Sequence, residues 1–168
     1  METNIRLYTL NYTEVRTYLF AALFVACNIA LPQLFHLIPQ GGIIFAPLSL
    51  VILAGAYNLG WKTGLLAALA SPLVNHLLFG MPAWSVMHVM VIKLATLAII
   101  AGVTAQHYKK VTIPLLITVV LISEVIGGLS ELLLTGGVSA TIADFTIGWP
   151  GLLLQVFGTY VLLKIFKK

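Results

Sequence analysis

Long apolar runs dominate the chain, and short breaks that hold glycine, proline or charged residues separate them. A helix that crosses a membrane needs about 20 mostly apolar residues. Six runs meet this requirement or come close to it. They cover residues 17–37, 42–59, 63–80, 84–106, 111–134 and 146–166. Because the breaks have the residues that turns favour, the pattern predicts an all-α bundle of six transmembrane helices, with residues 1–168 forming a single transmembrane domain.

Composition supports lipid as the solvent. Of the 168 residues, 60% are hydrophobic and only 8% are charged, whereas an ordinary soluble domain is about 25% charged. Cys27 is the only cysteine, which excludes an internal disulfide and a cysteine-based metal site. The basic residues occur singly or in pairs, so no nucleic-acid-binding patch is expected, and the predicted partners begin with the lipid bilayer.

The basic residues also predict the orientation. If the chain crosses the membrane six times, every Lys and Arg except Lys93 falls on one side. These residues are Arg6, Arg16, Lys62, Lys109, Lys110, Lys164, Lys167 and Lys168. The connections after the first, third and fifth runs contain no Lys or Arg. Because Lys and Arg mark the cytoplasmic side of membrane proteins, both the N-terminus and the C-terminus are predicted to be cytoplasmic.

Lys93 lies well inside the fourth run. A charge at this depth is costly, and it marks a functional site by default. Glu124 of the fifth run lies at a similar depth if the two helices are antiparallel, and Glu131 follows seven residues later on nearly the same helical face. We therefore expect a Lys93–Glu124 pair at the floor of a polar cavity. A purely structural ion pair is the alternative.

Other polar and aromatic side chains gather on the side away from the basic residues. They are Gln33, His36, Asn75, His76, Trp84, His88 and Trp149. Each has an ordinary interpretation by itself, since Trp at the end of a span usually anchors at the interface. Their concentration on one side is the stronger signal, and it favours a binding site that is open on that side.

The first run carries Ala22, Ala26 and Ala30, spaced by four so that they share one helical face. A face of small residues allows another helix to approach closely. Two interpretations remain open: packing inside this bundle, or docking of a partner protein.

Motifs for catalysis are lacking. The chain has no G-x-S-x-G, no H-E-x-x-H and no glycine-rich phosphate loop. Glu124, Glu131, His76 and His88 lack the i, i+3 or i, i+4 spacing of a helical metal site. We therefore expect no enzymatic activity, no ATP binding, no cofactor and no metal in this chain.

Two stretches carry a family resemblance. One runs from A-P-L at Ala46 to L-G-x-K-x-G at Gly64, and the other is L-L-F-G-M-P from Leu77 to Pro82. Together with the six runs and the alanine stripe, the chain resembles the substrate-binding S components of energy-coupling factor (ECF) vitamin transporters. It looks nearest to the folate-, pantothenate- and pyridoxine-type group.

The resemblance implies high-affinity binding of a vitamin or vitamin precursor in the plasma membrane of a bacterium or archaeon. It implies three partners, a membrane coupling subunit and two cytoplasmic ATPase subunits, and it implies that the alanine stripe faces the coupling subunit. The implied pocket takes in the polar residues named above together with Lys93, Glu124 and Glu131. Lys93 and His88 would favour a carboxylate ligand, whereas the two glutamates would favour an amine.

Two other functions remain as alternatives. The chain could be a small membrane enzyme that uses the intramembrane Glu and His side chains. It could also be a ligand-free assembly subunit of another membrane complex, with the alanine stripe as its interface.

Overall fold

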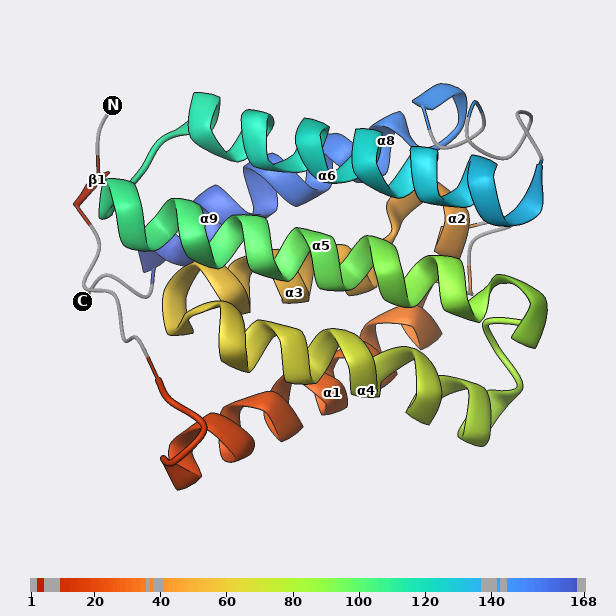
Figure 1. Ribbon diagram of the computed structural model, residues 1–168, viewed down its shortest axis with the longest axis horizontal. Helices are drawn as coiled ribbons and strands as arrows, with labels where there is room; N and C mark the ends of the chain where they lie inside the picture. Colours follow the sequence, from red (N-terminus) through yellow and green to blue (C-terminus); the bar gives the residue numbers. More distant parts are fainter. Residues whose placement is uncertain are drawn as a thin grey trace.

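The computed structural model describes residues 3–4, 10–35, 37, 41–136, 142 and 145–165, and it is all-α as expected (Figure 1). The helices are α1 (Val15–Phe35), α2 (Gly41–Phe45), α3 (Pro47–Leu59), α4 (Trp61–Phe79), α5 (Trp84–Tyr108), α6 (Ile113–Thr135), α8 (Trp149–Leu153), the π-helix η1 (Leu154–Gly158) and α9 (Thr159–Ile165). The two-residue strands β1 (Thr3–Asn4) and β2 (Lys110–Val111) pair antiparallel. His36 lies outside the described residues.

Three of these helices, α1, α5 and α6, are long and apolar enough to cross a membrane. Two shorter helical segments, Pro47–Leu59 and Trp149–Ile165, are also apolar. The second of these is continuous in the chain but changes from α to π and back to α across η1.

The expected run 42–59 is two helices rather than one. The chain breaks at Ala46, which has φ 40° and ψ 55°, in the left-handed region. Pro47 follows and begins α3, where its missing N–H costs nothing. The proline also disfavours a right-handed helical conformation at the residue before it, so the Ala46–Pro47 pair explains the interruption.

Helix α3 forms the centre of the bundle. It packs against α1, α4, α5 and α9, and Ile52, Leu53, Ala56 and Tyr57 on it are fully buried. The Tyr57 hydroxyl donates a hydrogen bond of 2.7 Å to the backbone carbonyl of Lys110, which begins β2. Helix α3 is therefore enclosed by protein along most of its length, while its neighbours carry the exposed apolar surface.

The two ends of the bundle differ in charge. The described basic residues other than Lys93 lie in the first turns of α1 and α4, in the connection between α5 and α6, and in the last turn of α9. These four places gather at the left end of Figure 1. The end of α4, the start of α5, the end of α6 and the start of α8 gather at the opposite end. The helix arrangement thus separates the cationic end from the end that carries most of the candidate binding residues.

Candidate functional site

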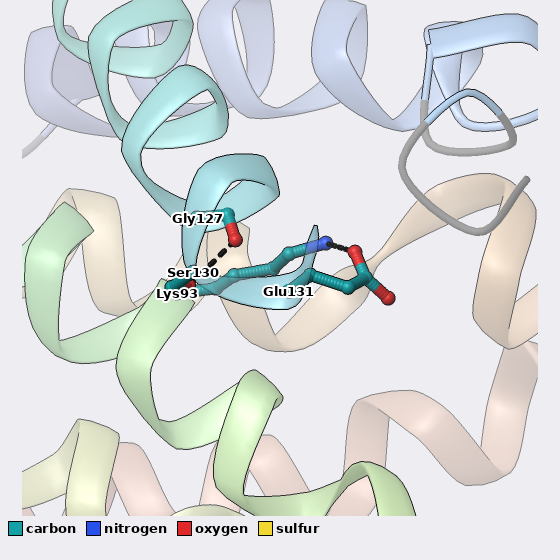
Figure 2. Close-up of polar contacts among 4 residues, drawn as sticks. All are labelled: Lys93, Gly127, Ser130 and Glu131. Atoms are coloured by element: carbon teal, nitrogen blue, oxygen red, sulfur yellow. Dashed lines mark hydrogen bonds and ion pairs between the residues drawn. The ribbon is translucent and has the colours of Figure 1, made fainter. Parts of the chain in front are cut away.

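An ion pair joins α5 to α6. Lys93 Nζ lies 2.7 Å from Glu131 Oε2, and the two side chains are 22% and 13% exposed. Figure 2 shows the lysine side chain reaching across the α6 backbone to the carboxylate. The two helices pack against each other, and Glu131 lies one turn before the end of α6. The pair is half-buried between two helices that are mostly apolar.

Gly127 makes room for the lysine. A Cβ at position 127 would lie 2.5 Å from Lys93 Cγ, so any other residue would collide with the lysine stem. The Ser130 hydroxyl donates a 2.6 Å hydrogen bond to the Gly127 carbonyl on the same turn (Figure 2). The lack of a side chain at Gly127 therefore allows the Lys93 stem to cross α6 at this position, from which its ammonium contacts Glu131.

The expected partner of Lys93 was Glu124. The ion pair at 2.7 Å is with Glu131, seven residues further along the same face of α6. Glu124 is half-buried on that face, about 10 Å deeper along the helix axis. A contact between Lys93 and Glu124 stays a prediction, whereas the Lys93–Glu131 contact is a feature of the structure.

A second polar group lies between the end of α4 and the start of α5. His76 Nδ1 is 2.8 Å from the Pro82 carbonyl. Because a carbonyl only accepts, His76 Nδ1 carries the proton in this contact, which leaves Nε2 of the neutral ring as an acceptor. The His76 and Trp84 rings are 5.6 Å apart between centroids, and Trp84 is 69% exposed.

These two groups do not form one cluster. Lys93 follows Trp84 by nine residues, and at 100° per residue the two side chains lie on opposite faces of α5. The exposed His88 shares the Trp84 face. Gln33 and Trp149 are both exposed, and their helix ends lie at the same end of the bundle as His76 (Figure 1). The residues that the sequence groups together therefore share an end of the bundle but not a single pocket.

Asn75 is used inside the protein. It is 5% exposed, and its Nδ2 donates to the backbone carbonyls of Asn28 at 3.0 Å and Ser71 at 2.9 Å. Asn28 Nδ2 in turn donates to Ser71 Oγ at 2.9 Å. This buried network joins α1 to α4, so in the structure Asn75 holds two helices together.

Sequence reasoning missed a buried polar pair in the sixth apolar run. Gln155 and Thr159 are 1% and 0% exposed, and neither Gln155 Oε1 nor Thr159 Oγ1 has a hydrogen-bond partner in the described part of the chain. Gln155 belongs to η1, and π-helical turns occur frequently at functional sites. The sequence does contain a signal for this pair, because Gln155 is a lone amide side chain in the middle of an apolar run.

The alanine stripe faces outward. Ala22, Ala26 and Ala30 are all exposed, whereas Thr17, Ala21, Asn28 and Pro32 form the buried side of α1. Among the described helices the stripe is therefore not a packing face. Packing inside the described bundle therefore does not explain the stripe, and docking of a partner protein stays a prediction.

No three His, Cys, Asp or Glu side chains within the described ranges lie close enough to share a metal ion. Comparison of the chain with known protein families, with curated proteins and with solved structures gave no match.

Proposed function

We propose that this chain is the substrate-binding S component of an ECF-type importer for a vitamin or vitamin precursor. The observation that carries the proposal is the half-buried Lys93–Glu131 ion pair, set in apolar helices near the end of the bundle opposite the basic residues. Paired charges at membrane depth are rare and mark ligand or ion pathways. A site of this kind needs no catalytic motif, and the sequence has none.

The proposed membrane arrangement has six crossings and both termini in the cytoplasm. In support, α1, α5 and α6 are long and apolar enough to span, and the described Lys and Arg residues outside the spans share one end of the bundle (Figure 1). The broken second crossing, α2 with α3, is acceptable because irregular backbone at membrane depth is tolerated where protein encloses it. In this arrangement the Lys93–Glu131 pair lies toward the extracellular side.

The proposed ligand site takes in the Lys93–Glu131 pair between α5 and α6, which supplies a cation and an anion. Gln155 of η1 is a further candidate, and it would supply an amide. Helix α6 packs against both α5 and η1. Pockets for small molecules are mostly apolar and contain a few polar groups that orient the ligand. The ammonium suits a ligand carboxylate, the carboxylate suits an amine, and Gln155 Oε1 is an acceptor still without a partner in the described residues.

The exposed alanine stripe supports the partner assignment. Ala22, Ala26 and Ala30 leave a shallow surface on which a helix of a coupling subunit can approach the α1 backbone. Two cytoplasmic ATPase subunits would then supply the energy, which agrees with the lack of a phosphate-binding loop in this chain. The plasma membrane of a bacterium or archaeon is the proposed location.

The test is mass spectrometry of the small molecules released when the detergent-purified chain is denatured, after expression in rich medium. We expect a vitamin or precursor at close to one per chain. The matched control is the double variant Lys93→Met/Glu131→Leu, which removes both charges and should release none while still folding. An empty wild-type protein, together with no thermal stabilisation by a panel of vitamins, would contradict the proposal.

A further inference from the structure

A cavity lies at the basic end of the bundle, away from the candidate site. Its volume is about 590 Å³, and α1, α3 and α9 form its walls. Most of the lining is apolar and includes Leu23, Phe24 and Leu163, and the polar lining residues are Arg16 and Asn58. The size falls within the range of small-molecule pockets. Nothing in the proposed vitamin-binding function uses this cavity.

The lining is arranged with its polar part at one end. Arg16 lies in the first turn of α1 and Asn58 in the last turn of α3, and both of these helix ends belong to the basic end of the bundle. From Arg16 the lining continues along α1 to Phe24, a distance of about 12 Å along the helix. Beyond the first turn of α1, the residues of this helix that line the cavity are all leucine or phenylalanine. The cavity is thus cationic at the end near Arg16, which we call its mouth, and apolar along the rest of its α1 wall.

Arg16 is available to a ligand. Its side chain is exposed, and it forms no ion pair within the part of the chain that the structure describes. Lys62 adds positive charge at the same end, although its ammonium donates 2.6 Å to Asn11 Oδ1 and lies 5.4 Å from the centre of the Tyr12 ring. Among the described residues no carboxylate lines the cavity, so the charge of this lining favours an anion.

We propose that this cavity binds one anionic phospholipid, with the phosphate at Arg16 and an acyl chain along the apolar walls. The guanidinium fork matches a phosphate in geometry and charge. The proposal rests on the membrane orientation given above, because the basic end would then face the cytoplasmic leaflet, where anionic lipids attract Lys and Arg side chains. Phosphate and acyl chain together match a cavity that is charged at its mouth and apolar inside.

Gly55 shows how the interior is built. A Cβ at position 55 would overlap the Phe24 ring, so the absence of a side chain lets Phe24 lie directly on α3. The neighbouring Ala54 also lines the cavity with a small side chain. A larger residue at Ala54 would fill the space that the acyl chain needs without touching the cationic mouth, and the two halves of the proposed site are therefore separable by mutation.

The test is native mass spectrometry of the full-length protein, titrated in detergent with phosphatidylglycerol or with phosphatidylcholine as the zwitterionic control. We expect the protein to bind one phosphatidylglycerol molecule tightly and to bind phosphatidylcholine with lower affinity. Arg16→Gln should lower the phosphatidylglycerol affinity about fivefold, the change that corresponds to about 1 kcal/mol for a cationic side chain near a lipid surface. Arg16→Lys should retain most of it, and Ala54→Phe should lower the affinity for both lipids. Lys109→Gln, at the same end but outside the cavity, should change neither.

Three results would overturn the proposal: equal affinity for the two lipids, unchanged selectivity in Arg16→Gln, or unchanged binding in Ala54→Phe. It would also be wrong if the wild-type protein bound no lipid but a variant lacking residues 1–9 did, because the chain's own N-terminal segment would then occupy the cavity. Vitamin retention is measured on the same samples. Lipid binding without a vitamin would contradict only the proposed transport function, and a vitamin without selective lipid binding would contradict only the lipid site.

Discussion

The stem of Lys93 crosses α6 at Gly127, where a Cβ would lie 2.5 Å from Lys93 Cγ. We predict that Gly127→Ala forces the lysine off its path, destabilises the protein by about 1–3 kcal/mol as overpacked substitutions do, and weakens ligand binding. Thermal unfolding in detergent and ligand affinity measure the two effects. Leu133→Ala, on the exposed side of the same helix, is the control and should leave ligand affinity unchanged. Wild-type affinity in Gly127→Ala would show that the crossing is not needed for binding.

The ion pair itself predicts a coupling between Lys93 and Glu131. Removal of one partner leaves the other charge half-buried without this contact, so Lys93→Met and Glu131→Leu should each destabilise the protein more than the double variant does. We expect a coupling free energy of about 1–3 kcal/mol in a double-mutant cycle measured by thermal or denaturant unfolding. Additive effects of the two single changes would mean that the pair contributes nothing to stability.

Asn75 is predicted to affect stability and not ligand affinity. Asn75→Ala removes both hydrogen bonds from its Nδ2 to the carbonyls of Asn28 and Ser71. The Asn28 carbonyl then lacks a helical donor as well, because Pro32, four residues later, has no N–H, and a buried carbonyl left without a donor costs about 1–3 kcal/mol. The melting temperature should therefore fall while ligand affinity per folded molecule is maintained. The opposite result, an unchanged melting temperature with weakened ligand affinity, would support the sequence-based assignment of Asn75 to the binding site.

The alanine stripe predicts a loss of transport without a loss of binding. Ala26 is exposed on the outer side of α1, so Ala26→Trp should be tolerated by the fold but should keep a partner helix away from the α1 backbone. Uptake of the ligand in cells should be abolished, while the purified variant should retain the ligand. Ala26→Ser keeps the small size and is the matched control. Normal uptake by Ala26→Trp would remove the stripe from the docking role.

The gathering of the basic residues at one end could be predicted because it depends only on how many apolar runs separate them. The helical class likewise follows from apolar runs too long for strands. The break at Ala46 was also within reach, since the following Pro47 disfavours a continuous helix. The hydrophobic pattern alone does not predict this break, because the glycine, isoleucine and phenylalanine residues of α2 continue the apolar run up to Ala46.

The partner of Lys93 could not be predicted from spacing. Glu124 and Glu131 lie on the same face of α6, so periodicity makes them equivalent, and the choice depends on how far α5 is displaced along α6. The crossing at Gly127 contributes to that displacement, and it is a tertiary contact. By contrast, the spacing of nine positions from Trp84 to Lys93 already implies opposite faces of α5, and the sequence alone was sufficient to divide the expected site in two.

The thirteen residues of α3 have a consequence for how the protein is made. At 1.5 Å per residue this helix is about 20 Å long, short of the roughly 30 Å of a hydrocarbon core. In the proposed membrane arrangement, α3 would therefore have no stable place in lipid on its own during synthesis. Gly60 alone separates it from α4, which favours insertion of the two as a hairpin. Helices α5, α6 and α9, made later, would then enclose α3, so that the centre of the finished bundle is the part that depends most on the completion of the chain.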